Sequence, residues 1–278
     1  MNRHLVELHW LNSAEGPRPR RKEWPGATAV GNALPSDSLN LLFVTAPLSE
    51  PAQVLREAAE FFGPHSVWRI SAPASLAEMV ASTAQAAGMR PADAVPRMIL
   101  DPIPASPPCP AGLSVRAVTS RAELRDFIVA GGRGFRIPPW LLRIALPEVP
   151  RASRPGSPGI QLFVGYANGA PVATSAQLTL NGVVGVFFVA TVPEARRRGY
   201  GAALTWAAVE GGRGEGATVS YLQATAMGRP VYERMGYRWV DDYYHWGSPA
   251  SGFVQLRALV RVLGLLIRPR RKRRSGAA

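Results

Sequence analysis

The sequence predicts an α/β (α+β) protein with two unequal parts. Short runs rich in Val, Leu and Phe alternate with amphipathic segments of helical period. Two turn signals, Asn168-Gly169 and Asn181-Gly182, separate three consecutive strand-like segments. A proline-rich stretch, residues 102–111, divides the chain and is expected to be a linker. We therefore expect residues 37–101 to form a smaller α/β domain and residues 112–247 a larger domain with a mixed, mostly antiparallel sheet flanked by helices.

The N-terminal domain is predicted to alternate strands and helices in the order β-α-β-α-β. Residues 1–36 are polar and non-periodic, so we expect little order there. The predicted elements are a strand at Leu39–Thr45, a helix with Ser49 as N-cap and Pro51 in its first turn, a strand at Ser66–Ser71, a helix that opens on a Ser75/Glu78 capping box, and a strand at Arg97–Leu100.

The larger domain is predicted to read β-α-α-β-β-β-α-β-α-β. A crossover between Thr191 and Thr218 implies that the strands it joins are parallel. The predicted elements are Leu113–Val118, a helix capped by Ser120 and Glu123, a short helix at Pro138–Leu146, strands at 161–166, 172–180 and 183–191, a helix at 199–210, a strand at 218–224, a short helix at 230–235 and a strand at 237–246.

Charge and cysteine content limit the class of protein. The net charge is +13, with eight of the basic residues in the last 27, so the tail at 248–278 carries most of it. We expect this tail to be solvated and not to contact nucleic acid or membrane. One cysteine, Cys109, excludes a multi-cysteine zinc site, and we predict no metal. The first residues lack an apolar signal region, so a cytoplasmic location is expected.

Residues 183–201 carry the strongest chemical signal. An apolar strand is followed by Pro193, three arginines (Arg196, Arg197 and Arg198) and the Gly199-Tyr200-Gly201 turn that opens a helix. Free amide groups at a helix N-terminus bind phosphate, and glycine lets the backbone approach it closely. The pattern is neither a Walker A loop nor a dinucleotide fingerprint, because no Gly-Lys-Ser/Thr follows and Leu204 stands where a third glycine would be.

Two motifs give this segment a family resemblance. Arg196-x-x-Gly199-x-Gly201 matches the Arg/Gln-x-x-Gly-x-Gly/Ala signature, and Tyr232 to Tyr237 matches a Tyr-x-x-x-Gly-Phe/Tyr segment downstream. With this order of elements, residues 112–246 resemble a GCN5-related N-acetyltransferase (GNAT) domain. Residues 37–101 are interpreted as a degenerate partial copy of the same fold.

The resemblance implies an acetyl-CoA site and a catalytic acid. Pantetheine would pair with the backbone of Val189, Ala190 and Thr191, and the pyrophosphate would bind residues 196–201. Tyr232 would protonate the departing thiolate, since a thiolate leaving group needs an acid. Thr225 stands where many relatives have an asparagine that contacts the cofactor.

The sequence leaves the base and the acceptor open. Glu194, Asp241, Asp242 and His245 are candidate bases, and none is assigned. The leading hypothesis is acetyl transfer to a primary amine, on a small molecule or peptide, by direct attack in a ternary complex. The alternative is a non-enzymatic acyl-CoA-binding or interaction module. A homodimer also stays open.

Overall fold

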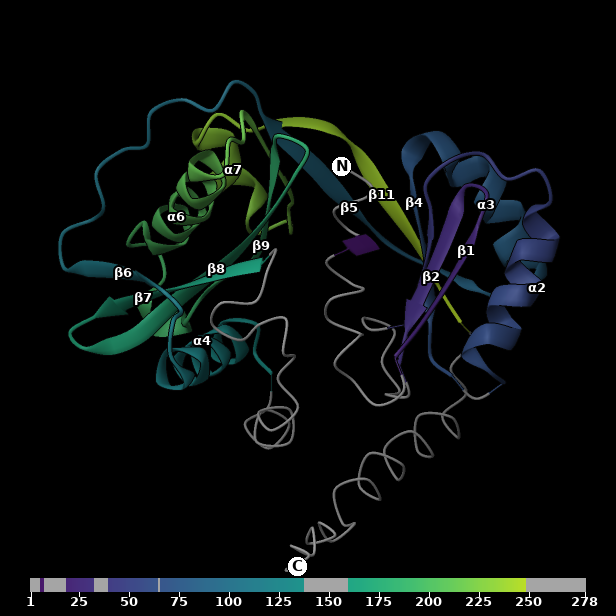
Figure 1. Ribbon diagram of the computed structural model, residues 1–278, viewed down its shortest axis with the longest axis horizontal. Coiled ribbons are helices and arrows are strands. Elements are labelled where there is room, and N and C mark those ends of the chain that lie inside the picture. Colours follow the sequence, from purple (N-terminus) through teal and green to yellow (C-terminus); the bar gives the residue numbers. More distant parts are fainter. Residues whose placement is uncertain (1–5, 8–18, 33–39, 65, 138–159, 249–278) are drawn as a thin grey trace, which may run out of the picture.

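One continuous sheet runs through the whole of the described chain (Figure 1). The structure is a computed structural model that describes residues 6–7, 19–32, 40–64, 66–137 and 160–248. Within these ranges eleven strands hydrogen-bond in the order β1-β2-β3-β4-β11-β5-β10-β9-β8-β7-β6. The predicted fold class is confirmed: the sheet is mixed, mostly antiparallel and flanked by helices.

The sequence contributes its elements to this sheet in two halves. The N-terminal half consists of β1 (Arg20–Trp24), β2 (Ala27–Gly31), β3 (Leu41–Val44), α2 (Pro51–Phe62), β4 (Arg69–Pro73), α3 (Ala74–Ala86) and β5 (Arg90–Leu100). The C-terminal half consists of β6 (Leu113–Ala117), α4 (Arg121–Gly134), β7 (Ile160–Ala167), β8 (Ala170–Leu180), β9 (Val183–Thr191), the 3-10 turn η3 (Pro193–Ala195), α6 (Tyr200–Gly214), β10 (Val219–Gln223), α7 (Arg229–Arg234) and β11 (Arg238–Gly247).

The two halves repeat one topology and exchange their last strands. The order β2-β3-α2-β4-α3-β5 repeats as β8-β9-α6-β10-α7-β11, and β3/β4 and β9/β10 are the two parallel pairs among the described strands. In the sheet, β5 of the N-terminal half pairs with β10, and β11 of the C-terminal half pairs with β4. The long strands β5 and β11 also pair with each other, and Figure 1 shows them spanning the two lobes. Each half therefore completes the sheet of the other.

Helices bury both faces of the C-terminal half. On one face, Leu204 and Trp206 of α6 pack with Met98 and Leu222 of the central strands. On the other face, Leu124 of α4 packs against β7 and β8. Leu100 joins the α6 cluster, so β5 contributes core residues to the C-terminal half.

Several sequence predictions need correction in the N-terminal half. Residues 20–31, where little order was expected, form the β1–β2 hairpin, because β2 pairs with β3 and buries Ala29 and Val30. No Ser75/Glu78 capping box forms: Pro73, still paired with Tyr243 of β11, is the N-cap of α3. Similarly, Glu50 rather than Ser49 is the N-cap of α2.

The caps and turns of the C-terminal half agree better with the sequence. The Ser120/Glu123 capping box is confirmed, and both Asn-Gly pairs form the turns between β7, β8 and β9. The parallel pairing of β9 and β10 is also confirmed. The predicted helix at 138–146 and the tail at 248–278, apart from Ser248, lie outside the described residues.

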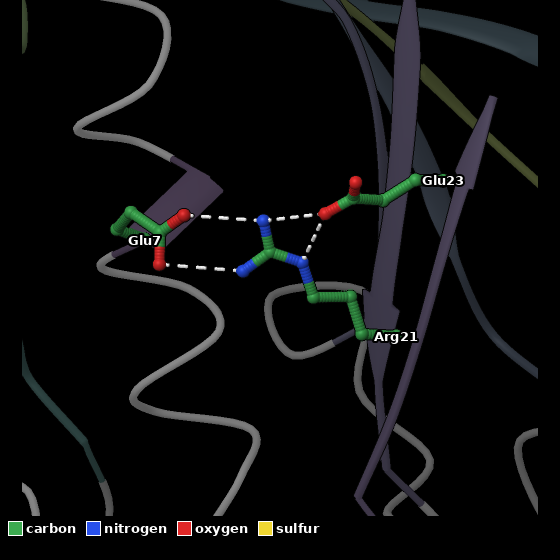
Figure 2. Close-up of polar contacts among 3 residues, drawn as sticks. All are labelled: Glu7, Arg21 and Glu23. Carbon is green, nitrogen blue, oxygen red and sulfur yellow. Dashed lines mark hydrogen bonds and ion pairs between the residues drawn. The ribbon is translucent and has the colours of Figure 1, made fainter. Parts of the chain in front are cut away.

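A three-residue ion cluster fixes residues 6–7 against β1 (Figure 2). The Arg21 guanidinium donates to both carboxylate oxygens of Glu7, at 3.1 and 3.3 Å, and to Glu23 at 2.8 Å. The neighbouring Val6 packs in a buried cluster with Tyr243 of β11, against which Phe187 of β9 also packs. Residues 6–7 are therefore held between elements of both halves.

A buried ion pair joins the exchanged strands. Arg97 of β5 lies opposite Asp241 of β11 and donates through Nε and Nη2 to its two carboxylate oxygens. The side chain of Arg97 is 7% exposed and that of Asp241 22%. A bidentate pair removed from water in this way tolerates the loss of one partner poorly, because the other charge is left without compensation.

We expect Asp241→Asn to lower the free energy of unfolding by about 3 kcal/mol, since it removes the carboxylate that pairs with the buried Arg97 guanidinium. Urea unfolding followed by circular dichroism would measure the loss. The control is Glu233→Gln, which breaks the exposed Arg229–Glu233 pair on α7 and should cost less than ~1 kcal/mol. Equal losses for the two variants would contradict a special role for the Arg97–Asp241 pair.

Candidate functional site

A cavity opens where β9 and β10 separate. Their parallel register runs from Val183 with Val219 to Val186 with Leu222 and then ends. Beyond this point β10 keeps pairing with β5, and the Ala224 amide donates to Pro96 O at 2.9 Å. β9 instead continues along β8. The strands diverge because each follows a different neighbour, and a cavity of about 1340 Å³ lies beside the gap.

Most residues singled out from the sequence line this cavity. On the β9 side they are Val189, Ala190 and Thr191; from the turn and α6 they are Arg196, Arg197, Gly199, Tyr200 and Gly201; on the β10 side they are Thr225 and Tyr232. Arg198 is exposed and is not among the lining residues. The structure thus brings two segments about thirty residues apart, 189–201 and 225–232, to one space.

The N-terminus of α6 faces this space with free amides. Gly199 is the N-cap and has left-handed backbone angles, φ 77° and ψ 0°. The first helical hydrogen bond that involves this turn runs from the Ala203 amide to Gly199 O. Within the described part of the chain, the amides at 197–202 have no acceptor. Such a set of aligned N–H groups, together with the helix dipole, favours an anion.

The three arginines before the helix have different environments. Arg196 donates to Thr191 O at 3.2 Å and to Gly134 O at 2.9 Å, so its side chain ties the turn to β9 and to the end of α4. Arg197 lines the cavity and has a positive φ of 61°. Arg196 is therefore placed to shape the turn, while Arg197 adds positive charge to the cavity.

Tyr232 is a buried phenol at the wall of the cavity. It lies in the short helix α7 and is 8% exposed. Burial raises the pKa of the Tyr232 phenol to about 12, although a hydrogen bond with Thr205 acts in the opposite direction. The hydroxyl is therefore protonated at neutral pH and can donate a proton into the cavity.

Thr225 begins the turn between β10 and α7. Its Oγ1 accepts a hydrogen bond from the Gly228 amide at 3.2 Å. The residue is exposed and lines the cavity, but its hydroxyl oxygen already stabilises the turn.

The four candidate bases lie outside this lining, and each has a partner. Asp241 pairs with Arg97, and Asp242 accepts from Trp239 Nε1 at 3.0 Å. His245 Nδ1 lies 2.9 Å from Ser71 Oγ in the N-terminal half. The fourth, Glu194, pairs with Arg133. A hydrogen bond from its own backbone, and then the Arg133 side chain, hold the pKa of the Glu194 carboxyl below its usual range.

The proline-rich segment has a place that the sequence did not indicate. Residues 106–110 line the cavity. Arg213 near the end of α6 donates to Ile103 O and Pro104 O, while Pro110 lies beside Gly199 at the start of the same helix. The expected linker thus runs along α6 and forms a wall of the cavity. Its sequence signals stiffness but not this position.

Residues 164–240 match the family model described as an acetyltransferase (GNAT) domain. This part of the chain is a GNAT acetyltransferase domain. The matched range begins in β7 and ends in β11, and it includes the 196–201 turn and Tyr232. A search of the curated proteins found no match to the chain.

Solved structures extend the GNAT likeness over both halves. A GCN5-related N-acetyltransferase from Kribbella flavida matches 91% of this chain and 97% of its own, with TM-score 0.69 and 21% identity. One from Sphaerobacter thermophilus matches 80% and 76%, with TM-score 0.55 and 18% identity. A tandem GNAT protein from the clavulanic acid biosynthesis pathway matches 89% of each chain, with TM-score 0.56 and 14% identity. At these identities the likeness concerns the fold, and it agrees with the repeated topology of the two halves.

Among the described residues, no helix is both long and apolar enough to cross a bilayer. No group of three or more His, Cys, Asp or Glu side chains in those ranges is arranged to hold a metal ion.

Proposed function

We propose that the protein transfers the acetyl group of acetyl-CoA to a primary amine, by direct attack within a ternary complex. The observation that carries the proposal is the cavity between β9 and β10, which combines a helix N-terminus with free amides and a protonated, buried tyrosine. Its position in a GNAT domain supports acetyl-CoA as the donor.

The cavity fits the chemistry of that donor. The pyrophosphate needs hydrogen-bond donors and positive charge, which the amides at 197–202 and the Arg197 side chain offer. The amide-rich pantetheine needs backbone partners. Residues 189–191 supply such an edge, because β9 has parted from β10 there.

The chain's own residues have distinct tasks in the proposed step. Bound acetyl-CoA supplies an activated acetyl group: an amide C–N bond forms as the thioester C–S bond breaks. The amine loses one proton and the sulfur gains one. Tyr232 holds a proton at its hydroxyl and delivers it to the sulfur. The α6 N-terminus orients the donor, while Arg196 keeps the turn against β9 and α4.

The alternative is an acyl-CoA-binding module without turnover. One observation favours it: the four candidate bases lie away from the described lining, and all have partners. If the protein does catalyse transfer, water is left to take the proton from the attacking amine. This is feasible for an amine that is partly neutral at the working pH.

Steady-state release of CoA, measured with purified protein, acetyl-CoA and a panel of amines, separates the two functions. Amine-dependent release with saturation in both substrates supports transfer in a ternary complex. Saturable acetyl-CoA binding by calorimetry, without release for any amine, favours the binding module. The absence of both binding and release refutes an acyl-CoA function altogether.

Tyr232→Phe tests the assigned acid. The variant should lower kcat by about 10²-fold, because the departing sulfur loses its proton donor, while the Kd for acetyl-CoA stays within about twofold. With a phenol pKa of about 12, the wild-type kcat should not fall through tyrosine ionisation up to pH ~10. Equal kcat values for the two proteins would remove Tyr232 from the mechanism. Tyr237→Phe on the neighbouring buried tyrosine, which bonds to Ser220, is the matched control.

A further inference from the structure

Two large apolar side chains lie exposed in the lining of the cavity, and a third lies exposed one residue from it. Phe135 follows α4 and is 50% exposed, Phe188 in β9 is 39% exposed, and Met227 between β10 and α7 is 69% exposed. Phe135 and Met227 line the cavity, and Phe188 directly precedes the lining residue Val189. We call Phe135, Phe188 and Met227 the apolar rim. Water-exposed apolar groups gathered at a cavity are typical of a binding surface.

The members of the rim on the β9 side come from adjoining elements. The end of α4 lies against β9, since a Cβ placed on Gly134 would be 2.7 Å from the Ala190 Cβ. Phe135 is next to Gly134, and Phe188 is two residues before Ala190. Met227 lies across the gap, on the side of β10. The rim therefore flanks both sides of the opening between the diverging strands.

Phe188 has an unfavourable backbone conformation. It has a φ of 51°, a left-handed value that bulky side chains avoid. The register shows why: between its pairs with Thr174 and Ala176, β9 contains one residue more than β8 and forms a bulge. The Thr174 hydroxyl donates to Phe188 O at 2.9 Å and fixes the bulge. Among the described residues, the other non-glycine positions with a positive φ are Arg136, Asn168, Asn181 and Arg197, so Phe188 is the one apolar side chain held in this region.

The charges near the cavity argue against an acceptor with a second positive group. The described lining has the cationic side chains Arg196, Arg197 and Arg234. Among the described residues, the lining has one carboxylate, Glu210. Its buried Oε1 lies 3.0 Å from Arg213 Nη1, which balances its charge without a hydrogen bond between the two atoms. A second ammonium group on the acceptor would meet like charge here without a free carboxylate to compensate it.

We propose that the apolar rim binds the body of the acceptor, which is therefore a primary amine with one aromatic or alkyl group and no second positive charge. This inference depends on the proposed acetyl transfer and adds the chemical class of the acceptor. It assigns a role to the strained phenylalanine: residues held in unfavourable backbone regions persist where they serve a site.

A matched amine series on the full-length protein tests the class. The probes are 2-phenylethylamine, ethylamine, 1,4-diaminobutane and glycine, with CoA release as the readout. We expect kcat/KM for 2-phenylethylamine to exceed that for ethylamine by at least about tenfold, as hydrophobic pockets typically discriminate. 1,4-Diaminobutane should be no better than ethylamine. Equal values for the series, or a preference for the diamine or for glycine, would overturn the inference.

Variants of Phe188 separate a loss of acceptor binding from a loss of protein stability. Phe188→Asn removes the apolar ring but accepts the left-handed backbone, so its melting temperature should not fall. Its KM for 2-phenylethylamine should rise about tenfold, and its kcat should change less. Phe188→Leu keeps an apolar side chain and should retain more of the affinity despite the strain. Val240→Asn, at a similarly exposed position on β11 that is neither in the described lining nor next to a lining residue in the chain, should match the wild type.

The results of these experiments separate the proposed acceptor class from the proposed acetyl transfer. If kcat/KM does not depend on the apolar group of the amine, or if Phe188→Asn leaves the KM for 2-phenylethylamine unchanged, the apolar rim does not bind the acceptor. The proposed acetyl transfer would be unaffected by that result. Acetyl-CoA binding without release for any amine refutes transfer, and the acceptor class with it. Turnover that follows side-chain apolarity rather than melting temperature supports both.

Discussion

Removal of residues 1–111 is expected to leave residues 112–278 unable to form a stable domain, although this segment contains the whole GNAT match. The reason is the strand exchange. β5 lies between β10 and β11, so the shortened chain would have a gap in the middle of its sheet. It would also lose Met98 and Leu100, which are at most 3% exposed in the α6 core. Two such losses cost about 2–5 kcal/mol each, comparable with the whole stability of a domain.

Circular dichroism and urea unfolding of the purified segment would check this expectation. Co-expression of residues 1–111 with residues 112–278 is the matched control, because the break falls in the proline-rich segment and leaves every strand intact. The two pieces together should recover a cooperative unfolding transition. A segment 112–278 that unfolds cooperatively by itself would show that β5 is dispensable for the C-terminal half.

The exchange also explains which parts of the fold could be predicted from the sequence. Local signals worked where the determinant is local. The Ser120/Glu123 box caps α4, the two Asn-Gly pairs form turns, and the crossover makes β9 and β10 parallel. The neighbours of β5 could not be predicted, because no short-range pattern records which distant strand completes a sheet. The β1–β2 hairpin could not be predicted for the same reason, since its burial depends on pairing with β3.

In the candidate site too, the residues that belong to local motifs could be predicted and the others could not. Residues 196–201 and Tyr232 form motifs in the sequence, and the structure brings both to one cavity. The proline-rich wall and Phe135 have no motif, because only the course of the chain past α6 and α4 places them there. The different tasks of Arg196 and Arg197 were not visible either, since adjacent side chains of one type are separated only by their contacts.

Replacement of Gly199 by valine should abolish acetyl-CoA binding, with Kd raised by at least about 100-fold, because the amides at the α6 N-terminus would be turned from their common direction. The backbone, rather than a clash, is responsible. A Cβ at Gly199 would meet Pro110 at 3.6 Å, an ordinary contact, but φ is 77°. A β-branched residue there costs about 1–2 kcal/mol or forces the turn to change. Calorimetric titration with acetyl-CoA measures the effect.

Gly216→Val supplies the matched control at the other end of α6. Gly216 also has a left-handed φ, 88°, and a Cβ there would meet nothing within 4 Å. The two variants should therefore lose similar stability, since the backbone strain is alike, while only Gly199→Val loses acetyl-CoA. Gly199→Asn should fall between wild type and valine, because asparagine tolerates the left-handed region. If Gly199→Val bound acetyl-CoA as tightly as Gly216→Val, the α6 N-terminus would not be the anion site, and the proposed function would lose its main support.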